Sequence, residues 1–169
     1  MVMAVDFISQ YGYLAVVLLM GLGIVGLPVP DETMMIFLGY LSSMKILNYA
    51  FSIVFSFIGS ILGMTVSYLI GNKIGYAIIE KYGKWIGLTP KRYEKVKAWF
   101  SKYGIWTLLF SYFIPGIRHA AGYISGISSM PFKKYLLICC TGAVIWTILF
   151  ISIGYFVGEH FISSFKINL

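Results

Sequence analysis

The chain alternates between long apolar stretches and short polar breaks. Two stretches contain no Asp, Glu, Lys or Arg: Ile46–Asn72, with 27 residues, and Tyr135–Gly158, with 24 residues. About 20 consecutive apolar residues are enough for a helix to cross the hydrocarbon core of a bilayer. Each of the two stretches is therefore predicted to be a transmembrane helix.

Two other apolar stretches, Phe7–Met44 and Tyr103–Met130, are interrupted in the middle. The interruptions read Pro28-Val29-Pro30-Asp31-Glu32 and Pro115-Gly116-Ile117-Arg118-His119. The arms that follow, Thr33–Met44 and Ala120–Met130, have 12 and 11 residues. At about 1.5 Å per residue, neither arm crosses about 30 Å of hydrocarbon as a helix. The pattern favours two re-entrant hairpins, and the alternative is that the longer arm Phe7–Leu27 spans alone.

An internal repeat relates the two halves. Gly39-Tyr40-Leu41-Ser42 recurs 83 residues later as Gly122-Tyr123-Ile124-Ser125. Other glycines follow in the same register, namely Gly21 with Gly104, Gly59 with Gly142, Gly71 with Gly154, and Gly75 with Gly158. Each half therefore has a broken hairpin followed by a spanning helix, and repeats built from discontinuous helices are typical of secondary transporters.

Positive charge is concentrated between the halves. The segment Lys73–Lys102 holds eight basic and two acidic residues, which is +6 of the net charge of +7. Cytoplasmic loops of membrane proteins carry such an excess of Lys and Arg, so the segment is predicted to be cytoplasmic, and nucleic-acid binding is disfavoured. With this loop inside the cell, the two halves have opposite orientations, as an inverted repeat requires.

A basic amphipathic helix is predicted within that segment. Thr89-Pro90 has the form of a helix start, with an N-cap residue followed by proline. The helix presents apolar residues on one side and lysines on much of the rest, which is typical of a helix at a membrane surface or of a cap packed on the bundle. The fold class is therefore an all-α membrane protein, an inverted repeat of re-entrant broken-helix hairpin plus transmembrane helix with a cytoplasmic amphipathic helix between the halves. We expect one membrane domain over residues 1–169, with repeat 1 at about 11–76, a basic cytoplasmic connector at about 77–102, and repeat 2 at about 103–158.

Composition supports a membrane protein. Hydrophobic residues make up 59% of the chain and charged residues only 11%, less than half of the share in soluble domains. The apolar content excludes disorder. The two cysteines, Cys139 and Cys140, are adjacent, which excludes a disulfide scaffold. We expect a multi-pass protein of the cell membrane.

The candidate chemistry lies at the two helix breaks. Outside loops and termini, the ionisable residues of the apolar stretches are Asp31, Glu32, Arg118 and His119, and such residues are costly in a membrane unless they serve a function. Broken helices leave backbone groups that need protein or a wet cavity to cover them. The structural residues of the breaks are Pro28, Pro30, Pro115, Gly116 and Gly122.

Arg118 is the candidate phosphate ligand. Helix N-termini after each break favour anions, and the planar guanidinium fits a phosphate bidentately. The structural alternative is a buried salt bridge between Glu32 and Arg118 that joins the hairpins. His119 is interpreted as a packing residue more readily than as a proton relay. No cluster of Cys and His predicts a metal site.

Two motifs resemble those of the DedA family of bacterial membrane proteins, which is related to eukaryotic VTT-domain proteins. They are Gly26-Leu27-Pro28-Val29-Pro30-Asp31-Glu32 and the segment 110–122 around Pro115-Gly116-Ile117-Arg118. The resemblance covers about residues 11–158. It implies two re-entrant loops and the translocation of lipids, among them undecaprenyl phosphate and phosphatidylethanolamine, with proton coupling in some members.

The chain departs from the family pattern at three charged positions. Glu32 and Arg118 match family residues, but Met20 and Met64 stand where many members have acids, and Tyr112 stands where many have a second Arg. These departures put proton coupling, and recognition of a doubly charged phosphate, in doubt. The candidate substrate-binding residues are Arg118, Glu32, Asp31, His119 and Tyr112.

The functional prediction is a translocase for a phosphate-bearing lipid such as undecaprenyl phosphate, not an enzyme. The alternatives are a phospholipid translocase or scramblase, a membrane-embedded lipid phosphatase, and a non-transporting assembly factor. No cofactor is predicted, and proton coupling stays open. The expected partners are membrane lipids with phosphate head groups, and the question of a homo-oligomer stays open.

Overall fold

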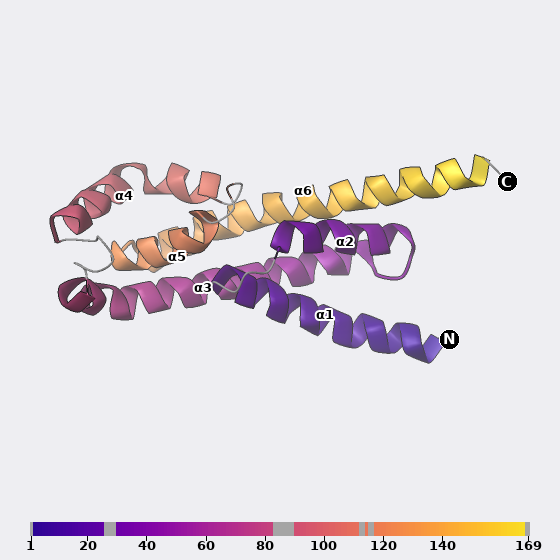
Figure 1. Ribbon diagram of the computed structural model, residues 1–169, viewed down its shortest axis with the longest axis horizontal. Helices are drawn as coiled ribbons and strands as arrows, with labels where there is room; N and C mark the ends of the chain where they lie inside the picture. Colours follow the sequence, from indigo (N-terminus) through magenta and orange to yellow (C-terminus); the bar gives the residue numbers. More distant parts are fainter. Residues whose placement is uncertain (1, 26–29, 83–89, 112–113, 115–116, 168–169) are drawn as a thin grey trace. The chain divides into compact units, whose positions relative to one another are not determined.

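The computed structural model describes residues 2–25, 30–82, 90–111, 114 and 117–167, and for some of these, chiefly 2–11, 74–82 and 90–94, the backbone alone. The described residues form helices and no strand, which confirms the all-α prediction (Figure 1). The helices are α1 (Val2–Val25), α2 (Asp31–Ser43), α3 (Tyr49–Tyr82), α4 (Pro90–Ser111), α5 (Ile117–Ile127) and α6 (Phe132–Ile167).

The two predicted transmembrane helices lie within α3 and α6. Tyr49–Lys73, with 25 residues, and Phe132–Phe161, with 30 residues, are each long and apolar enough to cross a membrane. By contrast, α2 has 13 residues and α5 has 11. Each is too short to cross about 30 Å at about 1.5 Å per residue, as the sequence pattern indicated.

The helix that begins at Pro90 is longer than the sequence analysis predicted. It continues without interruption to Ser111, so the basic amphipathic helix and the first arm of the second hairpin are one helix, α4. Between Pro90 and Ser111 there is no second proline to remove a backbone hydrogen bond. Gly104 alone costs about 1 kcal/mol relative to alanine, which is too little to end a helix that also packs.

The chain forms two compact units. Unit 1 comprises residues 1–60 and 143–169, and unit 2 comprises residues 61–142. Unit 1 therefore holds α1, α2, the beginning of α3 and the later part of α6. Unit 2 holds the rest of α3, α4, α5 and the beginning of α6. Each unit thus contains one short helix and the helix that precedes it, together with segments of both long helices.

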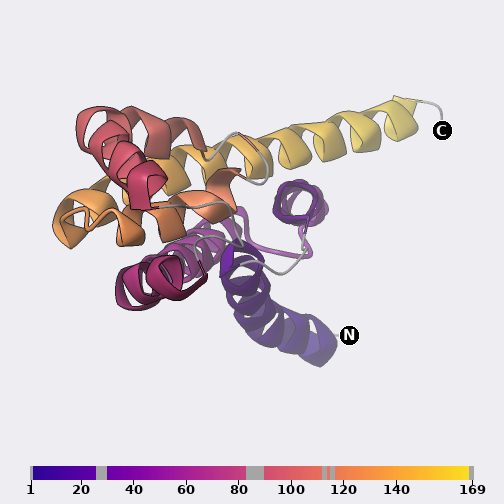
Figure 2. The same ribbon diagram turned by 60° about the vertical axis from the view of Figure 1, so that its left-hand side comes forward.

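In unit 1, helix α2 packs against three other helices (Figures 1 and 2). The Ser42 Oγ lies 3.3 Å from the Ser52 Oγ of α3. A Cβ on Gly39 would overlap the carbonyl oxygen of Ile151, so the backbones of α2 and α6 are in contact there. Gly23 of α1 gives room to the side chain that begins α2. Small residues let these helices approach closely, as is common between membrane helices.

In unit 2, helix α5 packs in the same way against α3 and α6 (Figure 1). A Cβ on Gly126 would overlap the carbonyl oxygen of Tyr68, and one on Gly71 would overlap that of Tyr123. The Tyr135 hydroxyl of α6 donates a hydrogen bond of 2.9 Å to the Met64 carbonyl oxygen. The rings of Tyr68 and Tyr135 stack with centroids 4.7 Å apart. These contacts fix α5 between the two long helices.

The sequence repeat is also a repeat of the buried face. The buried residues of α3 from Ser52 to Gly71 have buried counterparts 83 positions later in α6, with the single exception of half-buried Phe150. The same holds for α2 and α5, where the pairs are Met35 with Arg118, Leu38 with Ala121, Gly39 with Gly122, and Ser42 with Ser125. The two halves therefore use the same helix faces for packing, although the residues on them differ.

Both short helices end in a turn with positive φ at a residue other than glycine. After α2, Lys45 has φ of 59°, and the Ile46 N–H donates to the Leu41 carbonyl at 3.1 Å. After α5, Ser129 has φ of 54°, and the Met130 N–H donates to the Ser125 carbonyl at 3.1 Å. This is the pattern of a Schellman cap, whose left-handed position usually holds glycine.

We expect Lys45→Gly and Ser129→Gly each to stabilise the protein. A left-handed conformation costs about 1–2 kcal/mol for a residue with a Cβ, and glycine avoids that cost. Part of this stabilisation is offset, because glycine loses more conformational entropy on folding than other residues. Met44→Gly is the matched control, because Met44 has φ of −76°. Thermal unfolding in detergent is the measurement. If the control is stabilised as much as the two variants, the strain at the caps is not the cause.

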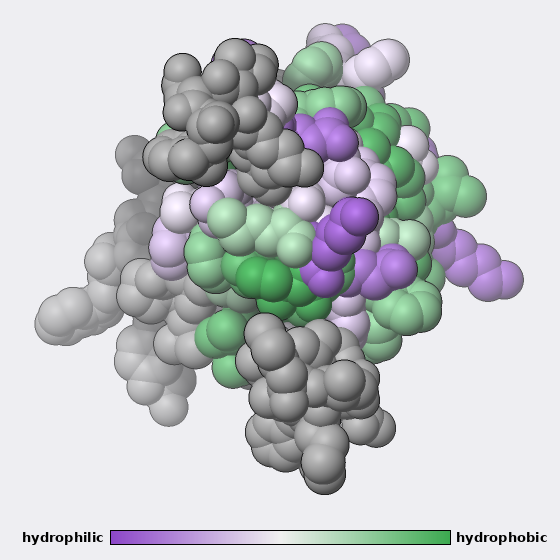
Figure 3. Space-filling model, turned by 90° about the vertical axis from the view of Figure 1, so that its right-hand side faces the viewer, coloured by the Kyte–Doolittle hydropathy of each residue, from purple (hydrophilic) through white to green (hydrophobic). Residues whose placement is uncertain are grey.

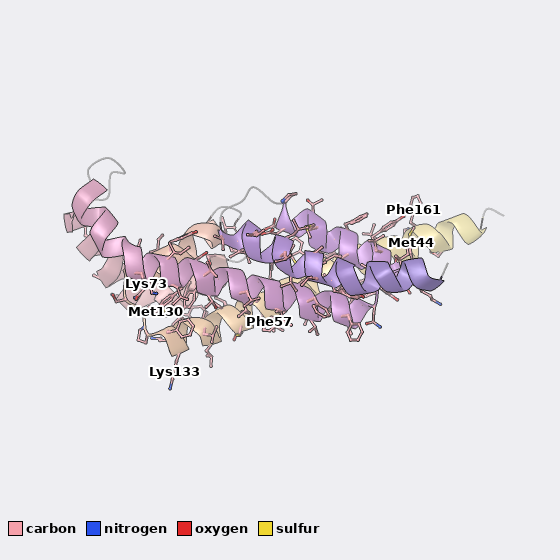
Figure 4. All side chains as sticks on the ribbon, turned by 90° about the horizontal axis from the view of Figure 1, so that it is seen from below. Met44, Phe57, Lys73, Met130, Lys133 and Phe161 are labelled. Atoms are coloured by element: carbon pink, nitrogen blue, oxygen red, sulfur yellow. The ribbon has the colours of Figure 1, made fainter. Side chains whose placement is uncertain are left out.

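The outer surface of both long helices is apolar. Leu137 is 70% exposed and Phe156 is 66% exposed, although both are hydrophobic. On the face shown in Figure 3, which includes the end of unit 1 with the α2–α3 turn, hydrophilic side chains lie among hydrophobic ones. In unit 2, Lys73 and Lys133 lie with Met130 near one end (Figure 4). Lys73 ends one candidate membrane span and Lys133 is the second residue of the other, and lysines at the ends of apolar spans are typical of a protein in a membrane.

Candidate substrate-binding site

Arg118 is almost completely buried in unit 2. It is the second residue of α5, its side chain is 1% exposed, and its backbone N–H donates to the Ile114 carbonyl at 3.3 Å. Ala121, Gly122 and Ser125, at spacings of three, four and seven residues, are buried on the same face of α5. The counterpart of Arg118 in the first half is Met35, which is also fully buried. At this equivalent position the first half thus has the uncharged thioether of Met35, and the second half has the permanent positive charge of Arg118.

Gly122 allows α5 to enclose this face. A Cβ on Gly122 would lie 2.8 Å from the Ser67 Cβ and 3.3 Å from the Tyr135 hydroxyl oxygen. The sequence analysis grouped Gly122 with the helix breaks, and the structure corrects this, because Gly122 lies inside α5 and serves close packing. Packing this close keeps lipid away from the face that carries Arg118, and polar groups persist in a membrane only where protein or water covers them.

The acid enclosed in unit 1 is Asp31. It is the first residue of α2 and is fully buried, whereas its neighbour Glu32 is half-buried. The Oδ1 atom of Asp31 occupies the space that a Cβ on Gly23 of α1 would need. Any side chain larger than hydrogen at position 23 would therefore displace the carboxylate. Of the two neighbouring acids, Asp31 is therefore more deeply buried than Glu32. The ion pair of Arg118 with Glu32 stays a prediction.

The described residues on either side of the first predicted break belong to two different helices. Helix α1 ends at Val25 and α2 begins at Asp31, and the exposed Pro30 accepts the first helical hydrogen bond, from the Met34 N–H at 3.0 Å. The second break separates Ser111 from Ile117. Several candidate residues lie outside the described parts, namely Pro28, Tyr112, Pro115, Gly116 and the side chain of His119.

Two positions that hold acids in many DedA proteins are part of the apolar interior here. Met20 is fully buried in unit 1, where its Cβ lies 2.8 Å from the position of a Cβ on Gly59. Met64 is 1% exposed in unit 2. Their thioethers fill space without charge. At these two positions the chain therefore lacks the carboxylates that many members of the family have.

Sequence analysis missed a row of buried hydroxyls on α3. Ser52, Ser56 and Ser60 are fully buried in unit 1, and Ser67 is fully buried in unit 2. The signal was the spacing of four residues between the first three, which places them along one helix face. The same spacing is common for small packing residues between membrane helices, so it does not by itself distinguish a polar row from a packing face.

The fold and the site together define a class. Two helices long and apolar enough to cross a membrane, together with a buried arginine at the start of a short helix, are typical of membrane proteins. The model of the VTT domain matches residues 29–156, which is most of the chain. The chain therefore belongs to the VTT-domain family of membrane proteins, the DedA family that its motifs resemble.

Three relatives illustrate the range of names in the family. The chain is 51% identical to the uncharacterized membrane protein YbfM of Bacillus subtilis, over 89% of this chain and 93% of that protein. It is 29% identical to an alkaline phosphatase-like protein of Lactococcus lactis subsp. cremoris, over 92% and 75%. It is 31% identical to the undecaprenyl phosphate transporter A of Staphylococcus aureus, over 92% and 79%. No solved structure matches the chain.

Proposed function

We propose that this protein is a multi-pass protein of the bacterial cytoplasmic membrane that moves a phosphate-bearing lipid from one leaflet to the other. The observation that carries the proposal is the burial of Arg118, because a permanent cation inside a membrane protein is costly unless it binds a counter-charge. The name of the S. aureus relative, undecaprenyl phosphate transporter A, supports a lipid carrying a phosphate.

In this proposal the lipid head group enters the protein while its tails stay in the bilayer. The guanidinium of Arg118 donates two parallel hydrogen bonds to phosphate oxygens, a geometry that favours planar recognition over a simple point charge. The N-terminus of α5, which carries Arg118, adds a favourable field for an anion. Asp31 and Glu32, the two acids at the start of α2, belong to the proposed set of binding residues. Tyr112 and His119 complete the proposed set of binding residues.

The proposed topology has two re-entrant hairpins, α1 with α2 and α4 with α5, in an inverted repeat. The shortness of α2 and α5 and the shared register of burial between the halves support it. With the basic segment in the cytoplasm, the first hairpin opens outward and the second inward. A head group then meets similar hairpins from either side of the membrane.

We expect single cysteines placed in the segment Lys73–Lys102 to react only with reagents that cross the membrane. The +6 charge of this segment favours its retention in the cytoplasm. The measurement is labelling of intact cells with permeant and impermeant maleimides, in a chain from which Cys139 and Cys140 have been removed. Labelling of the segment by the impermeant reagent would reverse the proposed orientation.

Undecaprenyl phosphate is the substrate we place first, and phosphatidylethanolamine is the alternative. One buried arginine neutralises one charge, so it suits a phosphodiester at least as well as a phosphomonoester. The deciding experiment reconstitutes the purified protein in liposomes with several labelled lipids and scores which lipid changes leaflet. If no phosphate-bearing lipid moves faster than in protein-free liposomes, the proposed function is wrong.

A lipid phosphatase is the second candidate, because two relatives from Lactococcus lactis are named alkaline phosphatase-like. Phosphoryl transfer needs a nucleophile with an activating base beside the phosphate ligand. The same liposomes distinguish the two activities. Release of inorganic phosphate from the lipid would favour the phosphatase, and retention of phosphate on a lipid that has changed leaflet would favour the translocase.

We expect exchange of the two charges, Glu32→Arg with Arg118→Glu, to restore stability but not transport. If the residues form an ion pair, exchange keeps the pair, yet it moves the guanidinium away from the proposed phosphate site. The single variants are the controls, since each places two like charges where the pair would form and should lower the melting temperature. The measurements are thermal unfolding and lipid transport in parallel. Full transport by the exchanged protein would contradict a binding role for Arg118.

A further inference from the structure

The row of serines in unit 1 contains hydroxyls that no described residue satisfies. Ser56 and Ser60 are fully buried, and their Oγ atoms have no hydrogen-bond partner among the described residues. The first member of the row, Ser52, pairs with Ser42 of α2 at 3.3 Å. Because Ser42 donates its own proton to the Leu38 carbonyl, Ser52 must donate in this pair and keeps its lone pairs available.

Other buried hydroxyls in this protein behave differently. Ser42, Ser125 and Thr147 each donate to the carbonyl oxygen four residues earlier in their own helix, at 2.8 Å, 2.6 Å and 2.8 Å. This is the usual way in which a hydroxyl is satisfied inside a membrane helix. The Oγ atoms of Ser56 and Ser60 make no such hydrogen bond. Leaving a buried hydroxyl unpaired is unfavourable, so these two require a polar partner of another kind.

The row leads along α2 towards the buried acid. Since Ser42 pairs with Ser52 and a short turn connects α2 to α3, the two helices run antiparallel, as Figure 1 shows. At about 1.5 Å per residue, Ser60 lies about 12 Å along α3 from Ser52, and Asp31 lies about 16 Å along α2 from Ser42. The last serine is therefore within about one helical turn of the level of Asp31.

We propose that Ser52, Ser56 and Ser60 bind water molecules inside unit 1, forming a hydrated path from the α2–α3 turn towards the carboxylate of Asp31. Water donates to and accepts from hydroxyls, so a short file of it satisfies both serines that the protein leaves unpaired. The path also supplies polar surroundings to a carboxylate that is enclosed against Gly23. The proposal does not depend on which lipid is moved.

The test uses single cysteines and a probe of about the size of water. In a chain with Cys139→Ala and Cys140→Ala, Ser56→Cys and Ser60→Cys are exposed to silver ions in liposomes and are then denatured and alkylated. We expect silver to abolish alkylation at both positions. Val54→Cys, on the exposed apolar side of α3, and Ile151→Cys, buried in α6, are the matched controls and should remain alkylated. Full alkylation of both serine-site cysteines would overturn the proposal.

A second measurement keeps the proposal testable if the cysteine variants fold poorly. Ser56→Ala and Ser60→Ala keep the small size needed for close helix packing but remove the hydroxyl. If the serines are only packing residues in a dry interface, alanine removes an unpaired polar group and the melting temperature rises. If the serines hold water, the melting temperature stays the same or falls. A rise in both variants would overturn the proposal, and neither outcome depends on whether the protein transports lipid.

Discussion

Replacing Arg118 with alanine is expected to remove nearly all lipid transport while leaving the protein folded. Arg118 is the described residue that combines a permanent charge with almost complete burial, and it lies at the N-terminus of α5. Alanine removes both the bidentate fork and the point charge, so a phosphate would lose its principal partner. The measurement is the rate of leaflet exchange in liposomes that contain equal amounts of protein.

Arg118→Lys is expected to lose less. It keeps the charge but not the planar fork, and a lost charge-assisted hydrogen bond is worth roughly 1.5–3 kcal/mol, or about a tenfold to hundredfold loss of affinity. The exposed lysines Lys133 and Lys134 are the controls. Their replacement by alanine should have small effects that fade at high salt. If Arg118→Ala folds normally and transports at the wild-type rate, the site recognises something other than phosphate.

Substitution of Gly154 is expected to have the largest effect on stability. A Cβ at this position of α6 would overlap the carbonyl oxygen of Ile36 and lie 2.7 Å from its carbonyl carbon. Because these are backbone atoms of α2, a change of side-chain rotamer cannot relieve the overlap. Gly154→Ala must push α2 away from α6, at a cost of about 1–3 kcal/mol. A larger residue such as leucine should prevent assembly of unit 1. Size-exclusion chromatography in detergent after heating is the measurement.

Two other glycines test the same explanation: Gly71 is expected to behave like Gly154, and Gly21 is the control. Gly71 is the counterpart of Gly154 in the first half, and its Cβ would overlap the carbonyl oxygen of Tyr123, so Gly71→Ala should destabilise unit 2 to a similar extent. At Gly21 a Cβ would lie 3.4 Å from the Gly59 carbonyl oxygen, which is an ordinary contact. Gly21→Ala should be neutral or stabilising by up to about 1 kcal/mol, because alanine favours the helix. Equal effects at Gly21 and Gly154 would refute the role of backbone contact.

The sequence alone located the two long apolar helices and the breaks beside them. A bilayer imposes a length, so uncharged runs such as Ile46–Asn72 can be recognised without knowledge of their neighbours. Prolines stop a helix by local sterics, so the end of α1 and the start of α2 were also predictable. The glycines in register 83 residues apart gave the repeat. The buried faces of α3 and α6 follow the same register, because a helix presents the same positions to its neighbours whichever residues fill them.

The sequence could rank the charged residues but could not say which of them are enclosed. Arg118 stood out because few arginines occur in apolar stretches, and its side chain is buried. Between Asp31 and Glu32 the sequence favoured Glu32, whereas the structure encloses Asp31 against Gly23. Adjacent residues on a helix point about 100° apart, so the orientation of α2 relative to α1 decides which acid faces inward.

Two further features depended on the tertiary structure for the same reason. The role of Gly122 in close helix packing follows from the Ser67 and Tyr135 side chains, which approach it from α3 and α6. Whether the buried Oγ atoms of Ser56 and Ser60 have hydrogen-bond partners among the described residues depends on how the neighbouring helices pack around α3. Length, hydrophobicity and helix breaking are properties of one segment and its solvent. Enclosure and hydrogen bonding are properties of several segments at once, so they appear only when the helices are packed.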